Sequence, residues 1–334
     1  MKFGLLWGCG LGDWIVAFPA IKYLTGSLGH QVFYFTKTSH VPKIFLDYQA
    51  RNSNFKIVFV PKGWAGLPLV ASYWGRLDCV VTLAELGKHA NYLLGYALLP
   101  RQTRFRRLDQ RWIGAQIFEL FAQQFTADGP AFDAFALSFA VPESACIPVP
   151  TDKYALFHPF ARLDWQTKQW PMDRWAALIE WLVAERHLRV LIAGDFVDRE
   201  LADGLVEQLP TVIRSRVDVL LGRELSEIVA LSKRARIAVC HNSGLMHIFA
   251  QLGTETVVIN GASAPAWLRP EPWVHNIDSG LCQLHCNSRQ CILPQRDARC
   301  VTGLPLERVR SLVDDVLQKT GAGREGQVPL MPES

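Results

Sequence analysis

An aspartate follows three closely spaced glycines near the start of the chain, in the run Gly8-Cys9-Gly10-Leu11-Gly12-Asp13. Glycines at this spacing let the backbone pass close to a ligand or to a neighbouring helix. A carboxylate just beyond such a turn can accept a proton from a hydroxyl group. It can equally act as the N-cap of a helix in a tight turn. Both interpretations fit, whereas the spacing is not that of a dinucleotide-binding fingerprint.

A second turn, His158-Pro159-Phe160-Ala161-Arg162, is followed by Thr167-Lys168-Gln169-Trp170-Pro171. This segment offers a hydroxyl group and two cations close to the predicted start of a helix. Such groups are suited to binding a diphosphate. The alternative is a solvated loop that packs Trp170 into the core.

Two later turns carry polar groups of the same kind. Asp198 follows Ala193-Gly194-Asp195 at the start of a helix, where a carboxylate complements the helix dipole or holds a ribose hydroxyl. In the run Cys240–His247, Ser243 and Gly244 would offer backbone N–H groups to an anion at a helix N-terminus. His247, one turn further along, either reaches the same ligand or is a buried core histidine.

These turns need strands and helices that bring them together. Short β-rich runs alternate with amphipathic segments along the whole chain, which predicts a parallel α/β architecture. In doubly wound sheets, ligands bind outside the carboxyl ends of the strands. The predicted strands are Phe3–Trp7, Gln31–Phe35, Lys56–Val60, Cys79–Leu83, Tyr154–Phe157, Leu188–Ile192, Val217–Leu220, Arg236–Cys240 and Thr256–Asn260.

Helical periodicity predicts helices from about Asp13, over 111–125, over Met172–Arg186 with Asp173 as a cap, and over about 198–208, 224–234, 245–252 and 304–319. A chain of 334 residues suits two domains. A proline-containing break at 141–154 indicates a linker. We therefore expect domains at 1–148 and 149–320, with a disordered tail at 321–334.

The motifs, taken in order, resemble glycosyltransferase family 9, the bacterial heptosyltransferases of lipopolysaccharide core synthesis. Gly12-Asp13 with Ala17-Phe18-Pro19-Ala20, HPFA…TKQWP, GDFVDRE, Gly222-Arg223 with the helix after it, and NSGLMHIFAQLG correspond to motifs of that family. The correspondence runs from residue 12 to residue 253, which is most of the chain.

The resemblance implies a GT-B fold of two Rossmann-like domains facing a central cleft, with the acceptor domain first and the nucleotide-sugar domain second. It implies inversion at the anomeric carbon without a catalytic metal, and ADP-heptose as the default donor. Asp13 would be the general base, and Gly10 and Gly12 would lie on the acceptor side. Lys168, Thr167, Ser243, Gly244 and His247 would stabilise the departing diphosphate, and Asp198 would contact the ribose or base.

Three positions depart from the family pattern. Asn242 replaces the aspartate that holds donor sugar hydroxyls, which exchanges a charged acceptor for a neutral amide. Phe160 and Asp195 each replace a glycine. These departures bear on the identity of the donor sugar.

The densest basic run is RQTRFRRLDQRW, in a chain of net charge +4. It is either a solvated face or a binding surface for an anionic acceptor or a membrane. No nucleic-acid motif accompanies it, so we do not expect nucleic acid as a partner. The arginines assigned to the acceptor side are Arg104, Arg106 and Arg107.

Four cysteines cluster in the pattern Cys282-x3-Cys286-x4-Cys291-x8-Cys300. In a reducing compartment this favours a structural zinc or iron ion, with free thiols and disulfides as the alternatives. Four thiolates would leave no open position on the metal, so no chemistry is expected there. Some related protein heptosyltransferases bind iron through such a cluster.

The leading hypothesis is transfer of a sugar to a lipopolysaccharide or related anionic glycan or glycolipid. The alternatives are a protein acceptor of autotransporter type and a non-catalytic binding protein that retains the fold. The N-terminus does not have the pattern of a secretory signal, and the apolar stretches are shorter than a membrane span. We therefore expect a cytoplasmic protein, with peripheral association at the inner face of the inner membrane.

Overall fold

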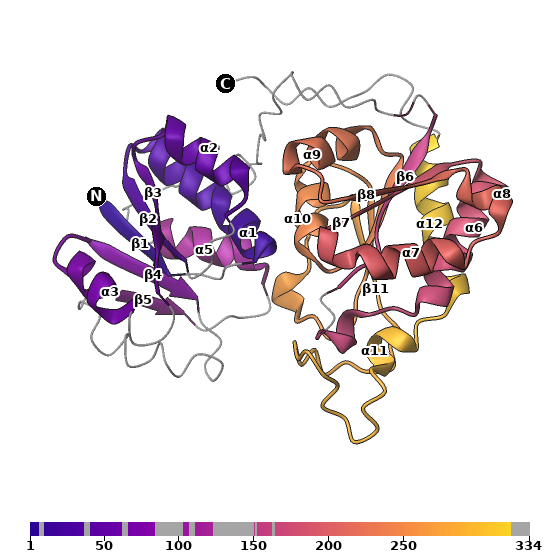
Figure 1. Cartoon of the computed structure of the whole chain (residues 1–334). Coiled ribbons are helices and arrows are strands. Elements are labelled where there is room, and N and C mark those ends of the chain that lie inside the picture. Colours follow the sequence, from indigo (N-terminus) through magenta and orange to yellow (C-terminus); the bar gives the residue numbers. More distant parts are fainter. Residues whose placement is uncertain are drawn as a thin grey trace. The chain divides into compact units, whose positions relative to one another are not determined.

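The computed structural model describes residues 1–6, 10–36, 41–61, 66–83, 103–106, 111–122, 150, 152–161 and 164–321. The chain divides into two compact units (Figure 1), one over Met1–Ser138 and Pro265–Trp267 and the other over Phe139–Ala264 and Leu268–Ser334. The predicted domain boundary at 148/149 and residues 322–334 of the predicted tail lie outside the described residues.

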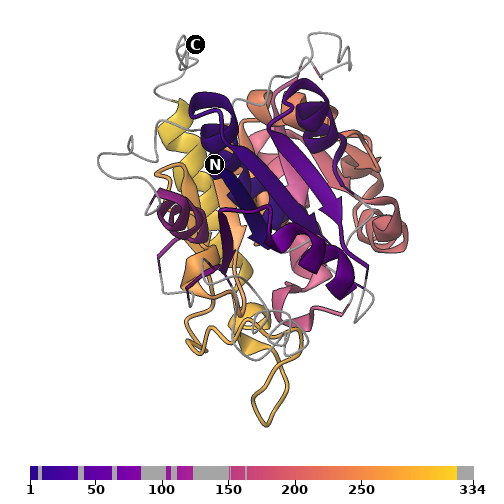
Figure 2. The same cartoon turned by 90° about the vertical axis from the view of Figure 1, so that its left-hand side faces the viewer.

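The first unit contains a parallel sheet in the order β3-β2-β1-β4-β5. Figure 2 shows its strands running side by side in one direction. Its strands are β1 (Lys2–Leu6), β2 (Gln31–Thr36), β3 (Phe55–Phe59), β4 (Cys79–Leu83) and β5 (Thr103–Arg106). Its helices are α1 (Leu11–Lys22), which continues as a π-helical turn over Tyr23–Ser27, α2 (Lys43–Arg51), α3 (Leu67–Trp74) and α5 (Ile113–Ala122).

Side chains alternate between the two faces of this sheet, as the two-residue period of a strand requires. Tyr34 lies on the face covered by α1, where Trp14 stacks on it with ring centroids 3.9 Å apart. Phe33 and Phe35 point to the other face and contact Tyr73 of α3. Both faces are therefore covered by helices, which is the arrangement of a doubly wound fold.

The second unit contains a six-stranded parallel sheet in the order β11-β10-β9-β6-β7-β8. Its strands are β6 (Tyr154–His158), β7 (Arg189–Gly194), β8 (Val217–Leu221), β9 (Ile237–His241), β10 (Thr256–Ile259) and β11 (Val274–Ile277). Its helices are α6 (Met172–Arg186), α7 (Arg199–Glu207), α8 (Thr211–Arg214), α9 (Leu225–Arg234), α10 (Gly244–Gln251), α11 (Arg299–Thr302) and α12 (Leu306–Gly321).

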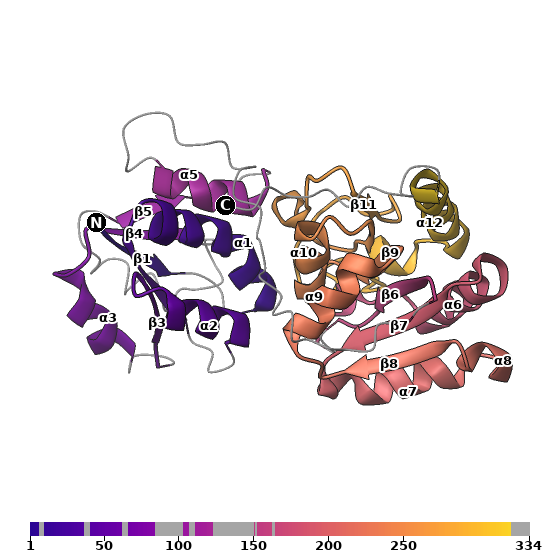
Figure 3. The same cartoon turned by 90° about the horizontal axis from the view of Figure 1, so that it is seen from above.

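Helices cover both faces of this second sheet. Figures 1 and 3 show α9 and α10 on one face, with α6, α7, α8 and α12 on the other. The core follows the same division: Trp175 and Ile192 belong to the α6 side, whereas Leu191 and Phe249 belong to the α9 and α10 side. The strand order of each unit is that of a Rossmann-like fold, as the sequence predicted.

Several predicted elements differ from the observed ones. The strands β5 and β11 were not predicted, and β5 occupies part of the basic run. Asp13 is not the N-cap of α1, since the helix begins two residues earlier and Gly10 takes that position. Asp173 likewise lies within the first turn of α6, after the N-cap Pro171.

Candidate functional site

The sheet of the second unit reverses its winding between β6 and β9. From β6 the chain proceeds outward to β7 and β8, and it then returns to β9 and proceeds the other way to β10 and β11. Ligands of doubly wound folds bind at this switch point, outside the carboxyl ends of the strands. Lys168 follows β6 and Asn242 follows β9, so the topology brings these two predicted site residues together.

Lys168 is held at this point by two contacts. Its ammonium Nζ donates to the backbone carbonyl of Asn242 at 3.1 Å. The same Nζ lies 4.3 Å from the ring centroid of Trp165, within the range of a cation–π contact. The 3₁₀ turn Gln166–Lys168 that carries it begins just after Trp165.

The helix α10 begins at the same edge of the sheet. Ser243 is its N-cap, with an extended backbone, and Gly244 is its first residue. The Ser243 hydroxyl does not cap the helix, and within the described residues this buried oxygen has no hydrogen-bond partner. An exposed set of backbone N–H groups at a helix start attracts anions.

His247 lies inside the first turns of α10 and is 2% exposed. Burial, followed by the charges of Arg269 and Lys168, holds the pKa of His247 well below its usual value. Its imidazole is therefore neutral. Arg269 is itself buried and forms an ion pair with Glu271.

Two more histidines, the partly buried His158 and the buried His241, lie at the ends of the central strands. His158 donates from Nδ1 to the carbonyl of Ala193 at 2.9 Å, and burial lowers its pKa. His241 accepts the backbone N–H of Trp170 on Nε2 at 3.1 Å. Burial, with smaller effects of the charges of His158 and Lys168, lowers the pKa of His241 to about 3. Both rings are thus neutral structural groups. His158 joins β6 to β7, and His241 joins the end of β9 to the segment before α6.

Three asparagines form a ladder across neighbouring strands. Asn242 Nδ2 donates to Asn260 Oδ1 at 3.3 Å, and Asn260 Nδ2 donates to Asn276 Oδ1 at 2.9 Å. Asn242 and Asn260 are buried, whereas Asn276 is exposed. The amide that stands in place of the family aspartate is therefore oriented by a second amide.

Asp198 ends a 3₁₀ turn after β7, and its Oδ2 accepts the backbone N–H of Asp195 at 2.8 Å. Gly194 lies beside it, because a Cβ at Gly194 would come within 2.9 Å of Asp198 Oδ2. Phe196 of the same turn is 66% exposed. A carboxylate next to an exposed aromatic ring can hold a ribose hydroxyl while the ring contacts a base.

Asp13 belongs to the first unit. Its Oδ2 accepts the backbone N–H of Gly10 at 2.8 Å, which fixes the carboxylate at the start of α1. Gly12 lies within the first turn of that helix. Arg104 and Arg106 lie in β5, whereas Arg107 lies outside the described residues.

Thr167 does not present its hydroxyl at the surface. The side chain is 1% exposed, and the hydroxyl donates to the carbonyl of Ser288 in the cysteine-rich segment. The turn Gln166–Lys168 and the cysteine-rich segment are therefore in direct contact.

The thiols of the cysteine-rich segment are all free: Cys282 and Cys286 are partly exposed, and Cys291 and Cys300 are buried. Among the residues that the structure describes, no three His, Cys, Asp or Glu side chains are placed to hold a metal ion. As placed, the thiols do not form a ligand set, and the zinc or iron ion expected from the sequence stays a prediction.

The structure thus gathers Lys168, Asn242, Ser243, Gly244 and His247 at one switch point, with Asp198 in the turn that follows the neighbouring strand β7. Sequence reasoning missed the side chains that support them. Asn260 could have been found, since it is the last residue of a predicted strand. Trp165, Arg269 and Asn276 carried no such signal. Over the described part of the chain, no helix is both long and apolar enough to cross a bilayer.

Comparison with known proteins identifies the family of the chain. The model of glycosyltransferase family 9 (heptosyltransferase) matches residues 90–296. The lipooligosaccharide heptosyltransferase 2 of Haemophilus influenzae is 29% identical over 104 residues, which are 31% of this chain and 30% of that protein. The match therefore spans less than a third of the length of this curated relative.

Two solved structures share the fold over nearly the whole chain. A family 9 glycosyl transferase from Veillonella parvula has a TM-score of 0.67 at 17% identity, covering 95% of this chain and 97% of that one. The ADP-heptose lipopolysaccharide heptosyltransferase II of Escherichia coli has a TM-score of 0.66 at 18% identity, covering 96% and 100%. The fold is GT-B, and the chain belongs to glycosyltransferase family 9, the heptosyltransferase family.

Proposed function

We propose that this chain transfers heptose from ADP-heptose to a hydroxyl group of a lipopolysaccharide or related anionic glycan, with inversion at the anomeric carbon. The observation that supports the proposal most is the contact of Lys168 with the turn before α10, because it places a positive charge beside the start of that helix at the switch point. The relatives support it, since one is named a lipooligosaccharide heptosyltransferase and another an ADP-heptose heptosyltransferase.

The donor diphosphate would lie between Lys168 and the start of α10. The ammonium group and the backbone N–H groups at Ser243 and Gly244 would neutralise the charge that develops on the departing ADP. Donors arranged in this way contribute about 3 kcal/mol each to the transition state. His247 would act as a neutral N–H donor, since its pKa is held low.

Asp13 would act as the general base. It takes the proton of the acceptor hydroxyl while that oxygen attacks the anomeric carbon. The bond between this carbon and the diphosphate oxygen breaks, and ADP leaves with the bonding electrons. The Gly10 N–H, which donates to Asp13 at 2.8 Å, holds one carboxylate oxygen in place. Asp13→Asn would keep this hydrogen bond and lower kcat by about 100- to 10,000-fold.

The acceptor would be anionic, and it would be reached at the cytoplasmic face of the inner membrane by peripheral association. Arg104, Arg106 and Arg107 would supply the positive charge that attracts it. The double charge reversal Arg106→Glu and Arg107→Glu tests this role. Loss of transfer to a phosphorylated acceptor, with transfer to its dephosphorylated form retained, is expected. Equal transfer to both by the variant would show that the run is only a solvated surface.

The donor site is tested by titrating the full chain with ADP, GDP, UDP and CMP in a calorimeter. We expect ADP to bind most tightly, and Lys168→Ala to weaken it about 10- to 100-fold through loss of a charge-assisted contact. Lys153→Ala, which removes an exposed lysine before β6, is the matched control. Preference for another nucleotide would exclude ADP-heptose, and no binding of any would exclude the donor site.

An acceptor screen with ADP-heptose then separates the remaining alternatives. Release of ADP that depends on a lipopolysaccharide core supports the proposal. Transfer to an autotransporter-type protein instead would make the chain a protein heptosyltransferase. Donor binding without transfer to either class would identify a binding protein that retains the GT-B fold.

A further inference from the structure

The turn that carries Lys168 is short. It is a single 3₁₀ turn, Gln166–Lys168, in which Gln169 N–H donates to the Gln166 carbonyl at 3.2 Å. A turn of this length does not hold a long side chain in one place by itself. The position of Lys168 therefore depends on what packs against the turn.

One side of the turn rests on the segment after β10. The backbone N–H of Ala262 donates to the Thr167 carbonyl at 3.2 Å. At Gly261 a Cβ atom would lie only 1.8 Å from that carbonyl oxygen, so only glycine allows this approach. Main-chain atoms thus meet main-chain atoms on this side.

The other side is covered by residues 287–289, which we call the strap. Thr167 donates its N–H to the Arg289 carbonyl at 3.4 Å and its hydroxyl to the Ser288 carbonyl. The N–H of Asn287 donates to the Ala262 carbonyl at 2.7 Å. The strap therefore contacts both the turn and the segment beneath it, and closes a clamp around Thr167.

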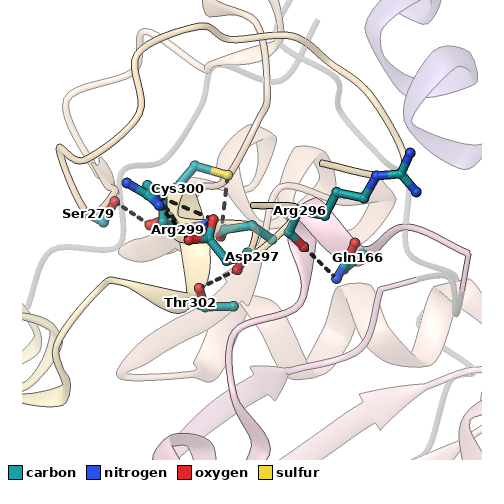
Figure 4. A network of polar contacts seen from close by, with 8 residues as sticks. Gln166, Ser279, Arg296, Asp297, Arg299, Cys300 and Thr302 are labelled. Carbon is teal, nitrogen blue, oxygen red and sulfur yellow. Dashed lines mark hydrogen bonds and ion pairs between the residues drawn. The ribbon is translucent and has the colours of Figure 1, made fainter. Parts of the chain in front are cut away.

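Side chains add weaker contacts to the same clamp. Arg289 pairs with Asp164 at 2.7 Å, but both side chains are about half exposed, with relative exposures of 57% and 44%. An exposed pair of this kind contributes less than about 1 kcal/mol. Gln166 Nε2 donates to the Arg296 carbonyl at 3.4 Å, as Figure 4 shows. The main-chain bonds of the strap are thus the principal restraint.

The strap lies inside the cysteine-rich segment. Cys286 directly precedes Asn287, and Cys291 follows Arg289 by two residues. Beyond them, Figure 4 shows Asp297, Arg299 and Cys300 in one polar network, with Arg299 and Asp297 paired at 2.7 Å. Cys286 is therefore bonded directly to the first residue of the strap.

We propose that the strap positions Lys168 for the donor diphosphate, and that donor affinity is therefore sensitive to chemical modification of the flanking Cys286. The inference rests on the proposed role of Lys168. It assigns the Thr167 hydroxyl, Asn287 and Ser288 to positioning, and it gives the cysteine-rich segment a place in the donor site.

Asn287 offers a matched pair of variants. Its φ is +45°, and its N–H is used by Ala262. Asn287→Pro removes the N–H and forbids this φ, whereas Asn287→Gly keeps both. We expect the proline variant to weaken ADP binding about tenfold or more, and the glycine variant to stay within about twofold. If the proline variant fails to fold, Asn287→Val, which keeps the N–H but disfavours positive φ, replaces it.

A double-mutant cycle shows whether the effect passes through Lys168. In a Lys168→Ala background, Asn287→Pro should weaken ADP binding no further. Equal loss in both backgrounds, or wild-type ADP affinity in the folded proline variant, would overturn the inference. Failure of the wild-type chain to bind ADP would instead overturn the proposed function.

Alkylation tests the cysteine arm with its own control. Iodoacetamide applied to the Cys282→Ser protein modifies Cys286 next to the strap, and the same treatment of the Cys286→Ser protein modifies Cys282 four residues further away. We expect loss of ADP affinity only in the first protein, with modification confirmed by peptide mass. Equal ADP affinities of the two alkylated proteins would overturn the inference that modification of Cys286 weakens donor binding.

Discussion

Lys168 and Asn242 meet through a hydrogen bond of 3.1 Å from the lysine ammonium group to the asparagine main-chain carbonyl. The contact joins the turn after β6 to the turn after β9, on either side of the switch point. Because the acceptor is a main-chain atom, substitution of the Asn242 side chain leaves this contact in place. The proposed roles of Lys168 toward a diphosphate and of Asn242 toward a sugar can therefore be tested separately.

Asn242→Asp should change the affinity for ADP-heptose through its sugar and leave the affinity for ADP unchanged. A carboxylate cannot donate to Asn260, so the Asn260 amide must reverse, which the exposed Asn276 at the end of the ladder permits. Charge-assisted hydrogen bonds are about twice as strong as neutral ones, so ADP-heptose should bind up to about tenfold more tightly.

The measurement is calorimetric titration of the wild type, Asn242→Asp and Asn242→Ala with ADP and with ADP-heptose. The alanine variant should lose affinity for the sugar nucleotide only. Weaker binding of ADP-heptose by the aspartate variant would show that position 242 is adapted to a different sugar.

Gly261→Ala should destabilise the chain and weaken ADP binding together. The new Cβ would overlap the Thr167 carbonyl, and displacing backbone in this way costs about 1–3 kcal/mol. Gly204→Ala is the control, because a Cβ there has nothing within 4 Å and the residue lies inside α7. Denaturant unfolding and ADP titration of both variants give the comparison. Equal stabilities would disprove the close approach at Gly261.

Stability should fall as the pH falls below about 6.5, the ordinary pKa of histidine. Burial lowers the pKa of His158, His241 and His247 in the folded chain, that of His241 to about 3. Between the lowered pKa of each folded histidine and its ordinary pKa, the unfolded chain binds more protons than the folded chain. The stabilising contribution of the neutral rings is therefore complete above pH 6.5 and is lost on acidification. At pH 5 the loss from His241 alone is about 2 kcal/mol, because its folded pKa of about 3 lies well below that pH.

Unfolding measured by denaturant from pH 8 to pH 5 checks this dependence. His241→Asn keeps an acceptor for the Trp170 N–H and should flatten the profile. His187→Asn, at an exposed position with positive φ, should not alter it. A profile that is flat in the wild type would contradict the buried neutral rings.

The four clustered thiols should react in two classes. Cys282 and Cys286 are partly exposed, whereas Cys291 and Cys300 are 9% and 5% exposed. Burial, and then the neighbouring thiolates, raises the pKa of Cys300 to about 11. Timed alkylation with peptide mapping should therefore modify the first pair well before the second. Equal protection of all four, relieved by a chelator, would instead show that they hold a metal ion.

Much of the fold follows from local pattern. The limits of β4 and α6 were predicted to the residue, because apolar runs and helical spacing end sharply there. The edge strands β5 and β11 escaped prediction. One carries two arginines and the other His275 and Asn276, so neither has the apolar run of a central strand.

The candidate site likewise has features that the sequence predicts and features that it does not. Lys168 and the start of α10 could be predicted, since both follow predicted strands whose carboxyl ends share one edge. The contact of Thr167 with Ser288 could not, because it joins residues 121 apart in sequence and ends on a main-chain carbonyl. The residue type at position 288 gives no indication of this bond, because every residue has a main-chain carbonyl.

The strap also bears on how this part of the chain can evolve. Its bonds to Thr167 and Ala262 use main-chain atoms, so most point mutations between Cys286 and Cys291 leave them intact. The length of the segment is the constrained quantity. Descendants of this sequence can diverge widely in the amino acids of this segment while conserving its length. A single insertion or deletion there would do more harm than several substitutions.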